Sequence, residues 1–183
     1  MPYGTEPSGD CQAPCRLKIV FEVLVTVSAR IPCNGITWIN YMEVATENQS
    51  SIRRAYIFPG QGSQSVGMGA ELHATSPAAR RVFEEADESL GVHLSKLVFQ
   101  GPAARLQDTI NSQPAIMTVS IACWKAWEEF QGSEVMKPSV VAGHSLGEYT
   151  SLVVAGVISF AEAVKLVRER GRLMQQAAVN RPG

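Results

Sequence analysis

Two short apolar runs in the sequence predict strands of a buried sheet. Residues 55–58 (Ala-Tyr-Ile-Phe) lead into a proline-glycine pair, and residues 139–142 (Ser-Val-Val-Ala) lead into a glycine. Short runs of β-branched and aromatic side chains between turn residues are typical of strands covered on both faces. Residues 17–27 are also rich in β-branched side chains and favour one more strand.

Hydrophobic spacing and helix-end residues predict helices between and after these strands. Ser76 followed by Pro77 is typical of a helix start, and Gly91 of the end of the same helix. Gln113-Pro114 opens a run that is apolar on nearly all sides, which predicts a buried helix. The predicted helices cover residues 77–90, 94–99, 103–108, 113–130, 148–155 and 160–178. Strands that alternate with helices in this order indicate the α/β class.

The sequence Gly143-His144-Ser145-Leu146-Gly147 joins the second predicted strand to a predicted helix. A strand, then G-x-S-x-G, then a helix is the context of a nucleophile elbow, a tight turn that exposes one serine hydroxyl. We therefore interpret Ser145 as a catalytic nucleophile. The alternative is that Ser145 is a plain N-cap of a buried helix, a position that serine also favours.

The predicted helix over residues 160–178 carries one misplaced charge. Ser159 and Glu162 have the spacing of a capping box at its start. One apolar stripe at the helical period contains Phe160, Ala163, Val164, Val167, Gly171 and Met174. Arg170 lies inside this stripe, where a guanidinium without a partner is costly to bury. Either Arg170 pairs with a carboxylate of the protein, or it binds an anionic ligand in a cleft.

Composition excludes several functional classes. The formal net charge of −1 gives no electrostatic footprint for nucleic acid, and no apolar run is long enough to predict a membrane span. Cys11 and Cys15 lack the further ligands that zinc requires, so no metal site is predicted. The four cysteines suggest no disulfide framework, which fits a reducing compartment and a cytoplasmic location. Cys123, within an apolar run, is predicted to be a small buried side chain.

Residues 1–53 differ in character from the rest of the chain. Residues 1–14 are rich in proline, glycine and polar side chains, which predicts a poorly ordered tail. A polar stretch after Met42 leads into the first core strand, and we interpret Met42 as the natural start of the protein. Because the first core strand begins after this polar stretch, the predicted organisation is an N-terminal extension over residues 1–53, followed by a domain over residues 54–183.

Three segments together resemble the malonyl-CoA:acyl carrier protein transacylases. They are residues 58–64 (FPGQGSQ), 143–149 (GHSLGEY) and 170–175 (RGRLMQ), and the similar residues 113–115 (QPA) precede the buried helix. The resemblance covers roughly residues 54–183 and implies an α/β-hydrolase-like large subdomain. In this family a small ferredoxin-like subdomain follows, so the chain resembles an acyltransferase domain truncated before that subdomain.

The resemblance also implies a reaction and roles for individual residues. Ser145 would take a malonyl group from malonyl-CoA and pass it to the phosphopantetheine thiol of acyl carrier protein, in fatty acid biosynthesis, without a cofactor. The backbone N–H groups of Gln61 and Leu146 would form the oxyanion hole. Arg170 would bind the free carboxylate of malonate, a task that suits the two-pronged guanidinium.

The general base that this chemistry requires is not evident in the sequence. The family histidine lies well downstream of the serine, whereas the histidines here are His73, His93 and His144, and none follows Ser145. His144 is expected to point away from the Ser145 hydroxyl and to pack or hydrogen-bond below the elbow, and the other two to lie on the surface. The isolated chain is therefore expected to have little turnover. A serine esterase or lipase, and a non-catalytic fragment that only binds acyl carrier protein, remain the alternatives.

Overall fold

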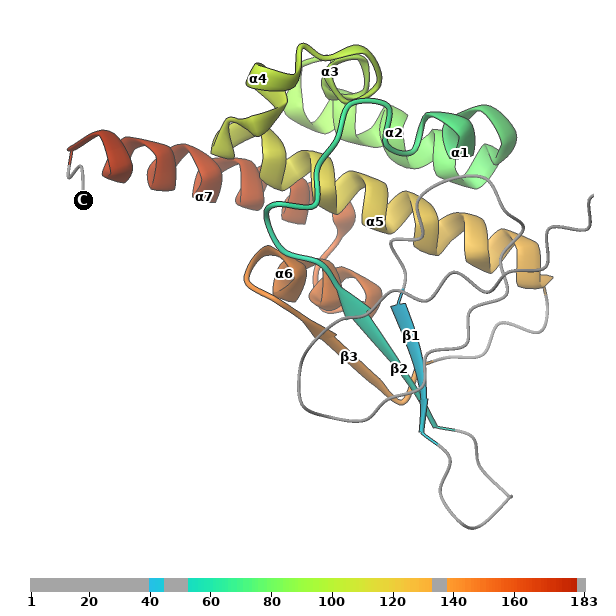
Figure 1. Ribbon diagram of the computed structural model, residues 1–183. Helices are drawn as coiled ribbons and strands as arrows, with labels where there is room; N and C mark the ends of the chain where they lie inside the picture. Colours follow the sequence, from blue (N-terminus) through green and yellow to red (C-terminus); the bar gives the residue numbers. More distant parts are fainter. Residues whose placement is uncertain (1–39, 45–52, 133–137, 181–183) are drawn as a thin grey trace, which may run out of the picture.

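The computed structural model describes residues 40–44, 53–132 and 138–180 and shows an α/β fold with a small sheet (Figure 1). The sheet order is β1-β2-β3, with β1 at Asn40–Val44, β2 at Arg53–Phe58 and β3 at Val140–Gly143. β1 is antiparallel to β2, and β2 is parallel to β3, with Phe58 opposite Gly143. Because β2 and β3 are parallel, the turns that follow them lie at the same edge of the sheet.

Helices make up most of the rest of the described chain. α5, the long helix in Figure 1, lies between the sheet with α6 on one side and α1 to α4 on the other, and α7 packs against it. Their bounds are α1 Ala70–Thr75, α2 Pro77–Leu90, α3 Leu94–Gln100, α4 Ala103–Gln107, α5 Thr109–Gln131, α6 Leu146–Val154 and α7 Phe160–Asn180.

The buried helix predicted from the apolar run is α5, but its predicted start is wrong. All residues from 112 to 122 are buried, which confirms the predicted burial. The helix begins at Thr109 rather than at Gln113, so Pro114 lies inside it. Because proline has no N–H, Pro114 removes one backbone hydrogen bond of the helix, the one to the carbonyl four residues earlier. The first turn of the helix still forms, since the Asp108 carbonyl accepts from the N–H groups of Asn111 and Ser112. Packing on all sides offsets this loss.

The predicted helix ends are confirmed at three places. The Ser76 hydroxyl accepts from the Ala79 N–H at 3.1 Å, and Gly91 ends α2 with a φ of 62°. At the start of α7, the Glu162 N–H donates to the Ser159 hydroxyl and the Ser159 N–H donates to the Glu162 carboxylate, both at 3.2 Å. This reciprocal pair is a capping box, and its hydrogen bonds lower the pKa of the Glu162 carboxyl.

The sequence predicted neither the short helix α1 nor strand β1. Strand β1 lies within residues 1–53, the range assigned to an N-terminal extension, and pairs along its length with β2. The strand predicted over residues 17–27, and the order predicted for residues 1–14, lie outside the described residues. The division of the chain at residues 53 and 54 stays a prediction.

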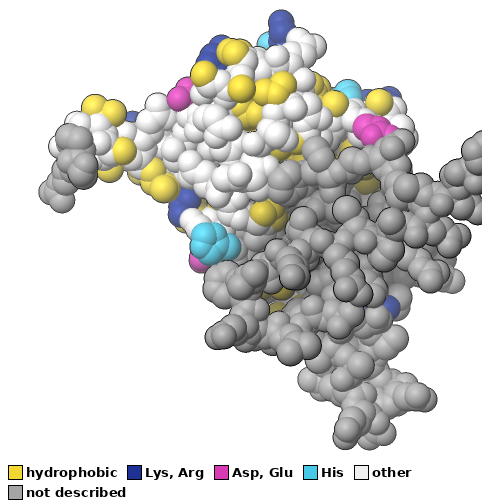
Figure 2. All heavy atoms as spheres, viewed as in Figure 1, with side chains coloured by type: hydrophobic (Ala, Val, Ile, Leu, Met, Phe, Trp, Pro, Cys, Tyr) yellow, Lys and Arg dark blue, Asp and Glu magenta, His cyan; other side chains and the backbone are white. Residues whose placement is uncertain are grey.

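The end of α7 projects beyond the other helices (Figure 1), and exposed hydrophobic side chains lie along it (Figure 2). Every residue from 172 to 180 is exposed, including Leu173, Met174 and Val179. The prediction that Met174 belongs to the buried stripe is therefore wrong, because this part of α7 projects beyond the other described helices, although the Met174 sulfur still accepts from the Gln113 side chain of α5. Among the described helices, none has the length and apolar character needed to cross a membrane.

Gly171 sets the distance between α5 and α7. It is buried, and a Cβ on it would collide with the carbonyl of Thr109 and with the Cα of Ile110. Both obstacles are backbone atoms, which cannot rotate away as a side chain could. Glycine at this position therefore lets the two helices approach closely at the start of α5.

We predict that Gly171→Ala destabilises the fold although alanine is the better helix former. Alanine in place of glycine within a helix normally stabilises it by about 1 kcal/mol. At Gly171 the added methyl group would force α7 away from α5, and overpacking of this kind costs about 1–3 kcal/mol. Urea unfolding followed by circular dichroism measures the difference, and a gain in unfolding free energy would contradict the close approach. Ala178→Gly, on the exposed end of α7, is the control for helix propensity.

We also predict that Cys123 is unreactive in the folded protein. The residue as a whole is half-buried and packs against the core, so the predicted burial is confirmed only in part. Burial raises the pKa of its thiol to about 12. The thiol is therefore protonated around pH 8, where only the thiolate is a good nucleophile. Iodoacetamide should leave Cys123 unmodified without denaturant and alkylate it in urea, as measured by peptide mass. Rapid alkylation of the folded protein would show that the thiol is not enclosed.

Candidate active site

Ser145 occupies the strained turn between β3 and α6. Its φ is 54° and its ψ is −101°, and it is the single non-glycine residue with positive φ in the ranges that the structure describes. Such a conformation costs about 1–3 kcal/mol and is characteristic of functional turns, including the nucleophile elbow. Ser145 makes no side-chain capping bond to α6, so the N-cap alternative is not supported.

The two glycines of the G-x-S-x-G motif permit close backbone contact. A Cβ on Gly143 would collide with the backbone of Gly147, and a Cβ on Gly147 would collide with the carbonyl of Phe58. The His144 N–H also donates to the Phe58 carbonyl at 3.2 Å. The elbow therefore presses against the end of β2, where the glycine-rich loop begins.

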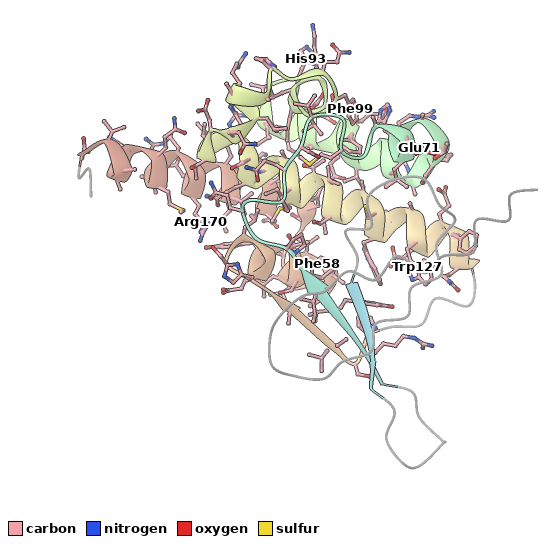
Figure 3. All side chains as sticks on the ribbon, viewed as in Figure 1. Phe58, Glu71, His93, Phe99, Trp127 and Arg170 are labelled. Atoms are coloured by element: carbon pink, nitrogen blue, oxygen red, sulfur yellow. The ribbon has the colours of Figure 1, made fainter. Side chains whose placement is uncertain are left out.

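Arg170 reaches the serine from α7 and lies between α7 and α6 (Figure 3). Its Nη2 donates to the Ser145 hydroxyl at 2.9 Å, and its Nη1 donates to the Gln113 side-chain carbonyl at 2.6 Å. Its Cζ lies 5.6 Å from the centre of the Tyr149 ring. In the described part of the chain no carboxylate forms an ion pair with Arg170, so the proposed pairing with a protein carboxylate is not found there. Among the described residues, the groups that hold this half-buried guanidinium are all neutral.

The glycine-rich loop after β2 is fixed to the start of α5. The Gln61 side chain donates to the Thr109 hydroxyl at 3.2 Å, and the Gly62 N–H donates to the Gln64 side chain at 2.9 Å. The backbone N–H groups of Gln61 and Leu146, the two predicted oxyanion donors, have no acceptor among the described residues. Within the described residues these two N–H groups, on the loop and on the first residue of α6, thus have no protein acceptor.

The histidines are placed differently from the sequence prediction in two of three cases. His144 is exposed and its ring lies against Gly60, so it does not pack below the elbow. His73 is half-buried and packs against the rings of Phe83 and Phe99, so its assignment to the surface is wrong. His93 is exposed, as predicted. None of the three donates to or accepts from Ser145.

Two side chains beside Arg170 were not identified from the sequence as site residues. Gln113 was interpreted as a helix start, and Tyr149 as part of the motif that follows the serine. The sequence held one indirect sign that Gln113 belongs to the site: it is a polar side chain at the start of an otherwise apolar run. The structure brings both into contact with the guanidinium.

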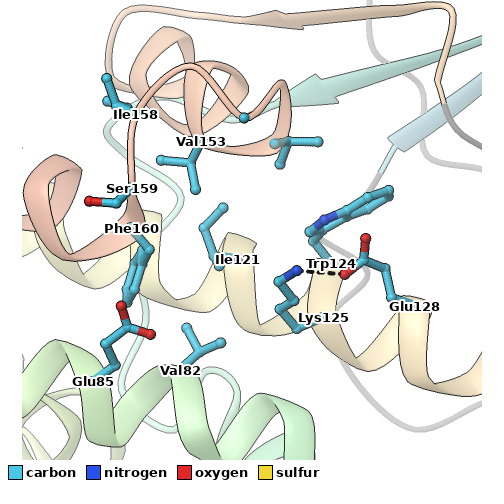
Figure 4. Close-up of a pocket in the computed structure, with 12 residues that line it drawn as sticks. Val82, Glu85, Ile121, Trp124, Lys125, Glu128, Val153, Ile158, Ser159 and Phe160 are labelled. Carbon is cyan, nitrogen blue, oxygen red and sulfur yellow. Dashed lines mark hydrogen bonds and ion pairs between the residues drawn. The ribbon is translucent and has the colours of Figure 1, made fainter.

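A cavity among the described residues lies away from this site. It has a volume of about 370 Å³ and lies between α2, the second half of α5 and the connection from α6 to α7 (Figure 4). Ile121, Trp124 and Phe160 line it, with the Lys125–Glu128 ion pair at its rim. None of the predicted site residues contributes to it. Within residues 40–44, 53–132 and 138–180, no three potential metal ligands lie together.

Comparison with known proteins agrees with this geometry. The chain is 53% identical over 123 residues to malonyl CoA-acyl carrier protein transacylases of Salmonella typhimurium and of Bacillus subtilis strain 168. These matches cover 67% of this chain but only 39% and 38% of the relatives, so the chain spans well under half of their length.

Solved structures of malonyltransferases also match the chain over about two thirds of its length. An acyl carrier protein S-malonyltransferase from Vibrio cholerae matches with a TM-score of 0.63 and 50% identity, over 67% of this chain and 39% of that chain. A malonyl-transacylase solved in complex with a type II PKS acyl-carrier protein matches with the same TM-score, identity and coverage. The acyl transferase domain family matches residues 55–182, and the chain belongs to this family.

Proposed function

We propose that this chain is the nucleophile-bearing part of an enzyme that transfers a malonyl group from CoA to acyl carrier protein. The observation that carries this proposal is the Arg170 guanidinium, which donates to the Ser145 hydroxyl and has no carboxylate partner in the described residues. A cation beside the nucleophile suits an acyl group that carries its own carboxylate. A simple esterase has no use for such a cation, so the arrangement disfavours that alternative.

The proposed first step replaces a contact within the protein by one with the substrate. The malonyl carboxylate takes the Arg170 Nη2 donor that now binds the Ser145 hydroxyl, while Nη1 keeps its hydrogen bond to Gln113. One methylene group separates that carboxylate from the thioester carbon, so binding at Arg170 brings the carbon to the serine. The Ser145 oxygen forms the new C–O bond, the C–S bond breaks, and the CoA thiolate leaves.

The negative charge that develops on the thioester oxygen requires hydrogen-bond donors. The free N–H groups of Gln61 and Leu146 are proposed to supply them. The proton of Ser145 is proposed to pass to a histidine in the remaining length of the whole enzyme, and then to the departing thiolate. In the second half-reaction the phosphopantetheine thiol of acyl carrier protein attacks the malonyl-serine ester and restores the hydroxyl.

The finer fold assignment and the cellular setting belong to the same proposal. The α/β unit corresponds to an α/β-hydrolase-like large subdomain, and a ferredoxin-like small subdomain belongs to the length that this chain does not span. The transfer requires no cofactor besides its two substrates, malonyl-CoA and the phosphopantetheinylated carrier protein. Low turnover of the isolated chain and a cytoplasmic location stay predictions.

We predict that malonyl-CoA slowly acylates Ser145 in the 183-residue chain. The elbow, Arg170 and the oxyanion donors are present, but a general base contributes about 10²–10⁴-fold, so the reaction should be slow. Intact mass and peptide mass spectrometry measure a single malonyl adduct on Ser145, and Ser145→Ala should abolish it. An adduct at another residue, or no adduct after prolonged incubation, would contradict the proposal.

We predict that Arg170→Ala reduces acylation by malonyl-CoA about 10–100-fold while acylation by acetyl-CoA is unchanged. A hydrogen bond to a charged group contributes about 1.5–3 kcal/mol, and the variant loses this contribution for malonyl-CoA. Acetyl-CoA has no carboxylate that could bind Arg170, so its acylation rate loses nothing. The ratio of the two acylation rates measures the effect. Arg172→Ala is the matched control, because Arg172 lies two residues further along α7 and its partners among the described residues are Glu169 and Gln176. Equal losses with both substrates would refute carboxylate binding by Arg170.

A further inference from the structure

Gln113 is the residue that fixes the orientation of the Arg170 guanidinium. Its side chain is fully buried in α5, and its carbonyl accepts from Arg170 Nη1 at 2.6 Å. Arg170 Nη2 is left to face Ser145. Gly171, next to Arg170 in sequence, lets α7 approach α5 closely enough for this bond. The direction of the cation therefore depends on a side chain 57 residues earlier in the sequence.

The amide of Gln113 has its orientation determined at both ends. Its Nε2 donates to the thioether sulfur of Met174 at 3.3 Å, one turn beyond Arg170 on α7. The reversed amide would direct its NH₂ group at the guanidinium, and two donors would face each other. The carbonyl therefore faces Arg170 and the NH₂ group faces Met174.

Because the Gln113 amide is neutral, it accepts a hydrogen bond from Arg170 without cancelling the positive charge, which a carboxylate would cancel. A glutamate in place of Gln113 would form a charge-paired bond with the guanidinium and cancel its charge. The substrate carboxylate would then compete with a permanent anion of the protein. The Tyr149 ring, the other close neighbour, is also neutral and attracts the cation through its π face.

We propose that Gln113 is a positioning residue that directs Arg170 at the nucleophile without neutralising it, and so sets the preference for acyl groups with a free carboxylate. This inference rests on the proposed malonyl transfer. Gln113 itself need not touch the substrate. Its effect on the reaction passes through the direction and the free charge of Arg170.

The first test compares acyl preference in two variants. Gln113→Glu keeps the shape of the side chain but adds charge, and should lower the ratio of malonyl to acetyl acylation of Ser145 at least tenfold. Gln113→Leu removes the acceptor and should lower the same ratio by less, since the cation stays charged but loses its direction. Acetyl acylation should stay within about twofold in both, whereas general damage to the fold would lower both rates.

Gln175→Leu is the matched control. Gln175 also lies at the contact of α7 with α5, where its side-chain carbonyl accepts from the Ile110 N–H at 3.3 Å, but it does not contact Arg170. Its loss should leave the acyl preference unchanged. A control that shifts the preference as much as Gln113→Glu would overturn the assignment to Gln113, as would an unchanged ratio in Gln113→Glu.

A second measurement does not depend on acyl transfer. NMR of the labelled Arg170 side chain reports rotation about its Nε–Cζ bond, which should be slow in the wild type and in Gln113→Glu, and faster in Gln113→Leu. Titration with malonate should shift the Arg170 signals in the wild type but not in Gln113→Glu. Equal malonate affinity in these two proteins, or slow rotation in Gln113→Leu, would overturn the inference. If malonate leaves wild-type Arg170 unshifted while Gln113→Leu frees its rotation, the proposed function fails but the positioning role stands.

Discussion

The structure depends on one half-buried guanidinium that no carboxylate of the described residues neutralises. Removing a cation from water costs several kcal/mol unless hydrogen bonds compensate it. Here a hydroxyl, an amide carbonyl and an aromatic ring supply the compensation, and they come from Ser145, Gln113 and Tyr149. Each is neutral, so the charge itself persists. The site therefore remains attractive to an anion that arrives beside the serine.

Close backbone contacts hold the three partners of Arg170 in place. Gly147 brings α6 against the end of β2, Gly143 brings β3 against α6, and Gly171 brings α7 against α5. At each contact the obstacle to a side chain is backbone, so the spacing of these elements is set by covalent geometry rather than by side chains that could repack. This rigidity allows the fold to maintain the strained φ of Ser145.

Local features of the fold and site were predictable from the sequence, whereas contacts between distant segments were not. The strand, the elbow and the helix after it follow from a pattern confined to about ten residues, and Arg170 was found because a charge interrupts an apolar stripe. β1 escaped prediction because its five residues, NYMEV, show no regular alternation of polar and apolar side chains. The start of α5 was misplaced because tertiary packing overrides the preference of proline for the first turn.

Gln113 shows why the partners of a charged residue are the hardest part of a site to predict. A carboxylate is the partner that sequence reasoning seeks for a buried arginine, and a glutamine carries no sign that it serves this role. In the proposed reaction the neutral partner matters as much as the cation. A protein carboxylate in place of the Gln113 amide would stabilise the site without substrate and so weaken substrate binding. The amide instead leaves part of the desolvation cost of Arg170 uncompensated until the carboxylate of the substrate binds. Selectivity for malonyl groups would then follow from the absence of a protein carboxylate beside Arg170 in the described residues.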